Sequence, residues 1–435
     1  MKFGHAFQEA LAADSYPPHW VEKAVPYRQL KKILGKVREE LIRNGYGPDT
    51  LPQLLAEHNA EYRLETDASH LLRPKLVVRP SLSVEQAAKP RALSEVALAA
   101  PVRTEAHLSE LNDNQREVDD DNGVIGLDGA DGWIKIPLSS DARFFGVLQT
   151  DLTELDTLQD MERQSMNDKI STLGNEIAEV AKPRKGLVRF SKSDLYRWRE
   201  IFELYLAAQV FFSTNEAASG LRKSEDARKQ LVWFQDEVNK RQLLQKFKIE
   251  SSAAAYAHFL ALNATLLQNL KFQELNQTAI TKIIKKFDKR TSLGVKRTFP
   301  KLMYSAHFIS EAISKDVCAQ LAREVVSLVP QVVDYTCTIC LSLCWLPIRL
   351  DCTHLFCIRC MIKMQNQNKR HCPLCRADVV QRANETHIDE QLVRYLERWF
   401  PKETKEKQAY NELERRRELL GDVYVGEEPP PCVVM

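Results

Sequence analysis

The feature that most constrains this 435-residue chain is a cluster of cysteines toward its C-terminal end. All ten cysteines lie after residue 317, and eight of them fall between residues 337 and 375. A domain stabilised by disulfides would be short and rich in cysteine throughout. A local cluster in a long chain indicates metal binding instead, in a compartment where thiols stay reduced.

The metal-binding pattern consists of four closely spaced ligand pairs, three of the form Cys-x2-Cys and one Cys-x-His. Seven thiols and one imidazole are enough for two closed tetrahedral zinc sites. Closed coordination predicts structural zinc ions that fold the segment rather than react. Two further cysteines, Cys318 and Cys344, fit no pair and are predicted to be packed or free thiols. The predicted ligands are Cys337, Cys340, Cys352, His354, Cys357, Cys360, Cys372 and Cys375.

The sequence CTICLSLCWLPIRLDCTHLFCIRC, followed by CPLCR, resembles the RING finger of ubiquitin ligases, in the form with one histidine among seven cysteines. The resemblance covers residues 337–376. It implies a small domain at 335–380 with a short β-hairpin, a helix and cross-brace pairing of two zinc ions. One ion would be bound by Cys337, Cys340, Cys357 and Cys360, and the other by Cys352, His354, Cys372 and Cys375.

The same resemblance implies a shallow groove that binds a ubiquitin-conjugating enzyme. The matching positions are Ile339, Pro373 and Leu374. Arg376 matches the position that contacts the donor ubiquitin, and Met364 stands where the family often has a tryptophan. Such a module acts by positioning the charged conjugating enzyme, so no residue here is expected to carry ubiquitin covalently.

Most of the chain before the cysteines has the apolar spacing of α-helices. The pattern covers residues 1–72 and 141–325 and predicts a mainly α protein with a bundle of long helices near 143–181, 192–213, 224–247 and 252–290. Residues 73–140 contain recurrent prolines and few large apolar residues, which predicts a mostly disordered insertion. Residues 296–334 are interpreted as a helical linker to the cysteines.

After the cysteines, residues 387–420 have an amphipathic pattern that predicts a C-terminal helix. Leu392, Leu396 and Trp399 recur on one side of it. Residues 421–435 include three consecutive prolines, which cannot pack within a helix, so a flexible tail is predicted.

Residues 280–290, ITKIIKKFDKR, combine an apolar stripe with a cationic one at helical spacing. Lysines four residues apart destabilise an isolated helix by a few tenths of a kcal/mol per pair. Asp288 is the only carboxylate in the segment. A bound polyanion would relieve the repulsion, although a solvated face is the more common explanation of such a pattern. The lysines are Lys282, Lys285, Lys286 and Lys289.

The combination of MKFG, PYRQLKK and LNQTAITKIIKKFDKRT resembles the SPX domain, a helical module that binds inositol pyrophosphates and phosphate. RWREIFELYLAAQVFF also resembles one of its helices. The resemblance covers residues 1–72 and 141–295 and departs from the family pattern at His5 and Ala24. It implies a phosphate-binding cluster of Tyr27, Lys31 and Lys286. The full implied set is Lys2, Tyr27, Lys31, Lys282, Lys285, Lys286 and Lys289.

The formal net charge of +2 produces no global attraction to a polyanionic partner. Nucleic acid would require a wider basic surface with stacking aromatics, so no nucleic-acid partner is expected. The N-terminal sequence lacks the apolar core of a signal peptide, and no apolar run approaches the ~20 residues of a membrane helix. We therefore expect a cytoplasmic protein.

The last four residues, Cys432-Val433-Val434-Met435, match a C-a-a-X prenylation signal, and a final methionine favours farnesyl. A single lipid gives only marginal membrane binding. We therefore expect peripheral association with the cytosolic face of membranes through Cys432. The alternative is an unmodified tail.

Together the two resemblances predict an SPX–RING ubiquitin ligase. Its expected partners are a ubiquitin-conjugating enzyme, ubiquitin and an inositol pyrophosphate or phosphate, which would connect it to phosphate homeostasis. Resemblance to SPX-containing ligases suggests phosphate-handling membrane transporters as substrates. The alternative is a non-enzymatic phosphate-sensing scaffold with a zinc-stabilised interaction module.

Overall fold

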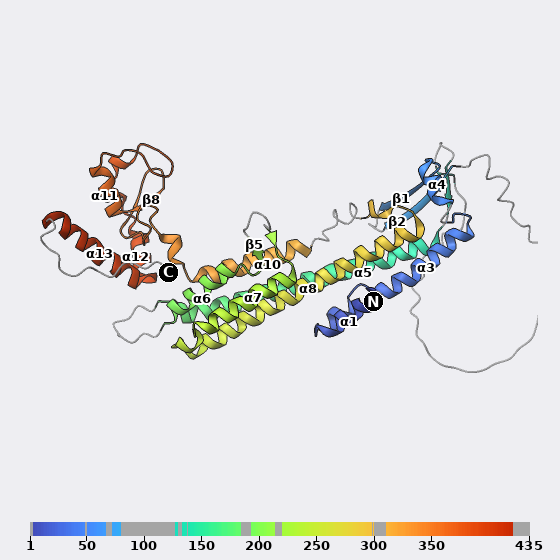
Figure 1. Ribbon diagram of the computed structural model, residues 1–435, viewed down its shortest axis with the longest axis horizontal. Coiled ribbons are helices and arrows are strands. Elements are labelled where there is room, and N and C mark those ends of the chain that lie inside the picture. The colour runs from blue at the N-terminus through green and yellow to red at the C-terminus, as the bar shows by residue number, and fades with distance from the viewer. Residues whose placement is uncertain are drawn as a thin grey trace, which may run out of the picture. The chain divides into compact units, whose positions relative to one another are not determined.

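A computed structural model shows the mainly α architecture that the sequence predicts (Figure 1). The chain divides into two compact units, Met1–Glu162 with Lys271–Ile313 (unit 1) and Arg163–Leu270 with Ser314–Met435 (unit 2). No helix in the described part of the chain is both long and apolar enough to cross a membrane. The structure describes residues 3–47, 50–66, 72–79, 127–128, 133–136, 138–183, 193–213, 220–297, 299 and 310–420.

The helices of unit 1 share one apolar core. They are α1 (Phe3–Ala13), α2 (Pro18–Glu22), α3 (Tyr27–Arg43), α4 (Leu51–Ala56), the first part of α5 (Ser139–Ala181), the last part of α8 (Glu250–Thr291) and the 3-10 turn η3 (Val295–Arg297). Helices α5 and α8 meet through Phe144 and Phe287, whose ring centroids are 4.9 Å apart. The face of α3 that the spacing predicts is buried, including Leu30, Leu34 and Val37.

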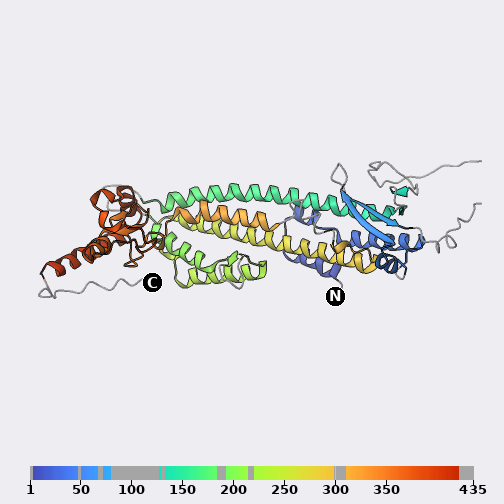
Figure 2. The ribbon, with the colours of Figure 1, turned by 90° about the horizontal axis from the view of Figure 1, so that it is seen from above.

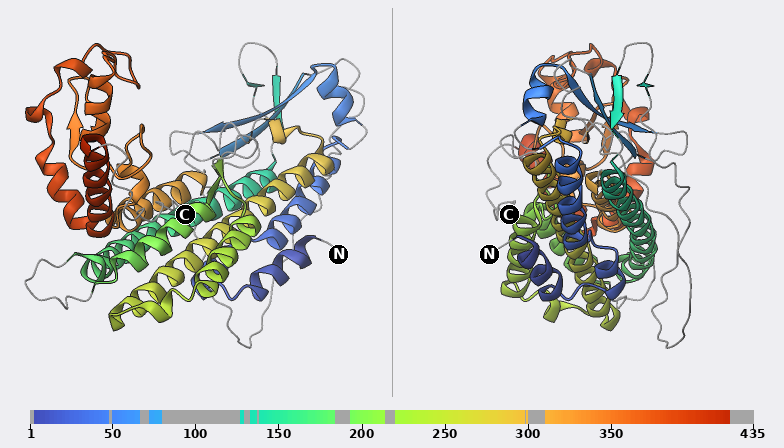
Figure 3. Two further views of the ribbon diagram at one scale, coloured as in Figure 1. Left: turned by 60° about the vertical axis from the view of Figure 1, so that its left-hand side comes forward. Right: turned by 90° about the vertical axis from the view of Figure 1, so that its right-hand side faces the viewer.

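Unit 1 also contains an antiparallel sheet, with strand order β1-β2-β4-β3. The strands are β1 (Ala60–Thr66), β2 (Leu72–Val78), β3 (Leu127–Asp128) and β4 (Trp133–Ile136). The sheet lies as a separate layer on the helices (Figure 3), and the hydroxyl of Tyr62 in β1 donates a hydrogen bond to Asp141 of α5.

This sheet corrects two expectations. The helical prediction for residues 1–72 is wrong at 60–66, where Tyr62 and Leu64 alternate with exposed residues at the period of a strand. The predicted insertion at 73–140 is wrong for residues 73–78, 127–128 and 133–136, which pair in the sheet, and for residues 139–140, which begin α5. Residues 80–126, at the centre of that insertion, lie outside the described part.

Unit 2 contains the remaining helices of the bundle. They are α6 (Leu195–Ala208), α7 (Ser224–Lys240), the rest of α5 and α8, and most of α10 (Ser310–Glu324), with the short hairpin β5 (Phe212–Ser213) and β6 (Gly220–Leu221) and the 3-10 turn η2 (Leu244–Lys246). Helices α6 and α7 pack against each other (Figure 2). Asp194, just before α6, accepts hydrogen bonds from the backbone N–H groups of Lys248 and Ile249 and from the Ser252 hydroxyl. The start of α6 is thereby joined to the start of α8.

The cysteine-rich module follows in unit 2. It consists of the antiparallel pair β7 (Pro347–Arg349) and β8 (Leu355–Cys357), helix α11 (Ile358–Asn366), and the 3-10 turns η4 (Val326–Leu328), η5 (Val332–Tyr335), η6 (Val380–Arg382) and η7 (Glu385–His387). The predicted β-hairpin and helix are both present.

The single helix predicted at 387–420 is instead two helices, α12 (Glu390–Trp399) and α13 (Pro401–Leu420). The break falls at Phe400, whose backbone angles are not helical. Proline disfavours helical geometry in the residue before it and lacks an N–H, and it is well suited to the first turn of the next helix. Pro401 therefore explains why one helix ends and another begins here.

Candidate functional site

The eight predicted zinc ligands gather in two groups of four. In each group the potential ligand atoms lie within 4.8 Å of one another. The grouping is the one that cross-brace pairing requires. The first group contains Cys337, Cys340, Cys357 and Cys360, and the second contains Cys352, His354, Cys372 and Cys375.

Three distances within the groups are close to those of tetrahedral zinc, and the Sγ atoms of Cys357 and Cys360 are closer together, at 3.2 Å. A Zn–S bond of ~2.3 Å places neighbouring sulfurs about 3.8 Å apart. The Sγ atoms of Cys340 and Cys357 are 3.7 Å apart. In the second group, Nδ1 of His354 lies 3.4 Å from Sγ of Cys352 and 3.6 Å from Sγ of Cys372. The donor set and its spacing therefore fit two structural zinc ions.

Local backbone geometry explains how the first and last ligand pairs form. The N–H of Leu341 donates to the carbonyl of Cys337, and the N–H of Arg376 donates to the carbonyl of Cys372, each at 2.8 Å. Leu341 and Arg376 both have positive φ, 52° and 63°. Each turn is therefore closed by a left-handed residue directly after its second cysteine, which directs both thiols of the pair to one side.

Cys318 and Cys344, which are not among the predicted ligands, are a partly buried and a buried thiol, as predicted. Burial raises the pKa of Cys318 to about 12, so this thiol stays protonated. Cys344 is buried in the core of the RING module, where hydrogen bonding to Cys337 and burial raise its pKa. Neither belongs to the two ligand groups.

Sequence reasoning missed one residue at the first zinc group, Lys407 of α13. Its side chain is buried, and its Nζ lies 3.6 Å from Sγ of Cys340. Four thiolates around Zn²⁺ carry a net charge of −2, so a nearby ammonium group stabilises them. The sequence offers no signal for this contact because Lys407 is 67 residues from Cys340.

The positions expected to contact a conjugating enzyme are on the surface. Ile339 is 40% exposed and Leu374 is 52% exposed, and Pro373 and Arg376 are also exposed. Met364, at the position that often holds tryptophan, is instead buried in the core of the module. This chain therefore offers no exposed side chain at that position of α11.

The second site is an open pocket in unit 1, with a volume of about 570 Å³. It lies between α3 and the last part of α8. Among the described residues, six cationic side chains and one tyrosine line it, and no carboxylate does. The lining residues are Tyr27, Arg38, Lys282, Lys285, Lys286, Lys289 and Arg290.

The pocket contains most of the predicted residues and two that were missed. Lys31 lies one turn after Tyr27 on α3, but it does not line the pocket. Lys2 lies outside the described residues. Arg38 and Arg290 complete the lining. Arg38 was recognisable because it follows Tyr27 by eleven residues, three helical turns, and so shares its face of α3.

Tyr27 is held in place by contacts on several sides. Its ring packs against Phe3 with centroids 4.9 Å apart. A Cβ atom at Gly4 would lie 3.2 Å from the Tyr27 ring, so glycine allows this close approach of α1. The buried side chain of Asn276 accepts a hydrogen bond from the N–H of Val25 at 2.9 Å and fixes the turn that leads into α3.

The electrostatics of the pocket favour an anion. The one carboxylate in segment 280–290, Asp288, accepts hydrogen bonds from the N–H groups of Val295 and Lys296, at 2.7 and 2.8 Å. Both of its oxygens therefore stabilise the turn after α8. Burial raises the pKa of Tyr27 and nearby Arg290 opposes this increase, so the hydroxyl remains a hydrogen-bond donor at neutral pH.

Two family models match the parts of the chain that contain these sites. The family model described as the SPX domain matches residues 1–303, and the model described as a zinc finger of C3HC4 type (RING finger) matches residues 337–375. No solved structure matches the chain significantly.

Two curated fungal proteins align with the chain over its whole length and theirs. The transcriptional regulator of yeast form adherence 3 of Candida albicans is 30% identical over 505 residues. An uncharacterized RING finger protein of Schizosaccharomyces pombe is 32% identical over 484 residues. The breast cancer type 1 susceptibility protein homolog of Mus musculus is 36% identical over 67 residues, which are 14% of this chain and 4% of that protein.

Proposed function

Because the chain belongs to the family of SPX-domain proteins and also carries a C3HC4 RING finger, we propose that it is a ubiquitin ligase whose output responds to an inositol pyrophosphate. The observation that carries the ligase assignment is the complete set of zinc ligands beside exposed Ile339 and Leu374. Because the zinc-bound thiolates are structural, the exposed side chains of Ile339 and Leu374, rather than a reactive thiol, carry the proposed ligase function.

The proposed ligase acts by bringing two proteins together. Ile339, Pro373 and Leu374 contact the conjugating enzyme through apolar side chains on the first and last ligand loops. Arg376 follows the last ligand, and its planar guanidinium can hydrogen-bond to the enzyme and to the donor ubiquitin together. The zinc ions, when bound, fold the two loops. The thioester of the conjugating enzyme is thereby held where a substrate lysine can attack it.

The cationic pocket of unit 1 supports an inositol pyrophosphate as the regulatory ligand. Lysines are point charges that surround a densely phosphorylated ring without a fixed geometry, and the two arginines add planar donors. The pocket is compact, and Tyr27 is the one aromatic residue that lines it in the part of the chain that the structure describes, with its ring packed against Phe3. Extended nucleic acid would instead require stacking aromatics along a groove. Resemblance to SPX-containing ligases supports phosphate-handling membrane transporters as the substrate class.

The ligase assignment is tested by reconstitution of the full chain with a panel of ubiquitin-conjugating enzymes. We expect discharge of ubiquitin to free lysine with at least one enzyme, and about a tenfold loss in Ile339→Ala. Val333→Ala is the matched control, because Val333 is exposed and apolar but precedes the first zinc ligand. If the chain binds two zinc ions but promotes ubiquitin discharge from no enzyme of the panel, the result would support the non-enzymatic scaffold instead of the ligase.

The ligand assignment is tested by calorimetry with an inositol pyrophosphate. We expect about tenfold weaker binding or more for the double variant Lys282→Ala/Lys289→Ala, with a smaller dependence of affinity on salt. Lys240→Ala, at an exposed lysine outside the pocket, should bind like the wild type. Equal affinity for single-stranded DNA of matched charge would contradict the assignment.

A further inference from the structure

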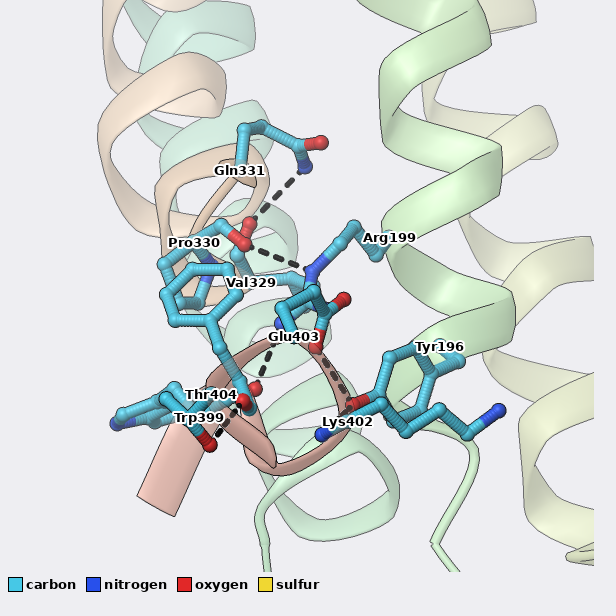
Figure 4. Close-up of polar contacts among 10 residues, drawn as sticks. Tyr196, Arg199, Val329, Pro330, Gln331, Trp399, Lys402, Glu403 and Thr404 are labelled. Atoms are coloured by element: carbon cyan, nitrogen blue, oxygen red, sulfur yellow. Dashed lines mark hydrogen bonds and ion pairs between the residues drawn. The ribbon is translucent and has the colours of Figure 1, made fainter. Parts of the chain in front are cut away.

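One arginine of α6 is buried, although most arginines of soluble proteins are exposed. The side chain of Arg199 is 7% exposed, and its guanidinium donates three hydrogen bonds (Figure 4). Nε donates to the carbonyl of Pro330 at 3.0 Å, and Nη2 donates to the carbonyl of Trp399 at 2.8 Å. Nη1 pairs with Oε1 of Glu403 at 3.1 Å.

These three partners come from both sides of the RING finger in the chain. Pro330 precedes the first zinc ligand, Trp399 ends α12 and Glu403 lies in the first turn of α13. The segment that enters the RING finger and the segment that leaves it therefore meet at one side chain. A planar group with donors on several edges is suited to such a junction, and a lysine ammonium could not reproduce its geometry.

Aromatic and polar contacts enclose the guanidinium. It lies over the ring of Phe400, 4.3 Å from the centroid, and beside the ring of Tyr196 at 5.0 Å. The Tyr196 hydroxyl donates to Oε2 of Glu403 and accepts from the N–H of Lys402. Both oxygens of Glu403 are therefore bonded to α6, and the pair is partly buried, with Glu403 23% exposed.

The segments that Arg199 binds also contact the RING finger. Tyr335 and Tyr395 are joined through their hydroxyls at 3.2 Å, and Leu343 packs with buried Leu396 and Phe400. Further along α13, Glu418 pairs with Arg359 of α11 at 2.7 Å. Lys407, which contacts Cys340 of the first zinc group, lies on α13 between Glu403 and Glu418. A constraint on the junction is therefore a constraint on the RING finger.

We propose that Arg199 is a positioning residue that holds the RING finger in one orientation on α6, so that ubiquitin is delivered to a restricted set of lysines. This inference rests on the proposed ligase function. The chemistry of discharge depends on the zinc loops and not on Arg199. Loss of the arginine should therefore change where ubiquitin goes more than how fast it leaves the conjugating enzyme.

The test compares Arg199→Met with Arg197→Met in the full chain. Arg197 is on the same helix, but its side chain is 38% exposed, and it pairs with Glu200 of that helix at 3.3 Å. Three quantities are measured: hydrogen exchange of residues 400–420, discharge of ubiquitin to free lysine, and the lysines of the chain that become ubiquitinated. Glu403→Gln is the milder second variant, which keeps the shape of the junction if Arg199→Met does not fold.

We expect Arg199→Met to increase exchange in α13 by about tenfold or more, because one partner of a buried pair is removed. Free-lysine discharge should stay within about twofold of the wild type, and ubiquitin should spread to additional lysines of the chain. Arg197→Met should leave all three unchanged. Wild-type exchange and wild-type sites in Arg199→Met would overturn the proposal. If no enzyme is discharged even by the wild type, the ligase function fails, and the exchange measurement alone still shows whether Arg199 holds the junction.

Discussion

The buried carboxyl of Asp141 predicts a pH-dependent stability of unit 1. This residue lies in the first turn of α5, and its Oδ2 accepts a hydrogen bond from Tyr62 at 2.7 Å. Its Oδ1 has no hydrogen-bond partner among the described residues. Burial raises the pKa of Asp141 from 3.8 to about 7; the hydrogen bond from Tyr62 opposes this increase, and nearby Glu40 adds to it.

The sign and size of the effect follow from this shift. Between pH 3.8 and about 7 the folded protein keeps the proton of Asp141 and the unfolded chain has lost it, so stability falls as pH rises. Each pH unit in this range costs about 1.36 kcal/mol. The loss from pH 5 to pH 7 is therefore about 2 kcal/mol, because Asp141 is half ionised at pH 7, and the loss approaches its limit of about 3 kcal/mol by pH 8.

The perturbation is Asp141→Asn, which keeps the shape and the acceptor for Tyr62 but cannot ionise. We expect the variant's advantage in unfolding free energy to grow by about 3 kcal/mol between pH 5 and pH 8. Urea unfolding followed by short protease pulses measures this, with fragments from unit 1 as the readout. Asp160→Asn, at an exposed carboxyl on the same helix, is the control. The same difference in unfolding free energy between variant and wild type at both pH values would show that Asp141 does not cause the pH dependence.

Three further predictions follow from single contacts. Lys407→Met should release zinc to a chelator about tenfold faster than exposed Lys405→Met, because the thiolate of Cys340 loses its ammonium partner, and equal rates would exclude this role. Asn276→Leu should weaken inositol pyrophosphate binding about tenfold in calorimetry, because the buried N–H that leads into α3 loses its acceptor; wild-type affinity would contradict the positioning role. Cys432→Ser should move the protein out of membrane fractions, and an unchanged distribution would argue against prenylation.

The zinc groups and the lysine stripe were predictable because both depend on local spacing. Three Cys-x2-Cys pairs and one Cys-x-His pair specify turns within a few residues. Lys282, Lys285, Lys286 and Lys289 share one face of a helix through its period alone. The choice between a solvated stripe and a pocket depends on the approach of α3, which local spacing does not contain. Local spacing also could not predict that Asp288 accepts hydrogen bonds from the segment after α8.

The features that sequence reasoning missed depend on partners far apart in the chain. Strand β1 pairs with β2 and not with a helix, and short strands of this kind give a weak signal beside long helical patterns. The sequence does not distinguish Arg199 from the other polar residues of α6, because its hydrogen-bond partners lie 131 to 204 residues away in the chain. The break between α12 and α13 is different, since Pro401 is a local signal that the amphipathic pattern outweighed.

Coupling between the cationic pocket and the RING finger is tested most directly by the rate of ubiquitin discharge by the full chain, measured with one active conjugating enzyme while an inositol pyrophosphate is titrated. We expect a saturable change in rate for the wild type, and a midpoint at about tenfold higher ligand concentration or more for Lys286→Ala. Discharge that does not respond to the ligand in either protein would contradict the claim that this chain joins a phosphate sensor to a ubiquitin ligase.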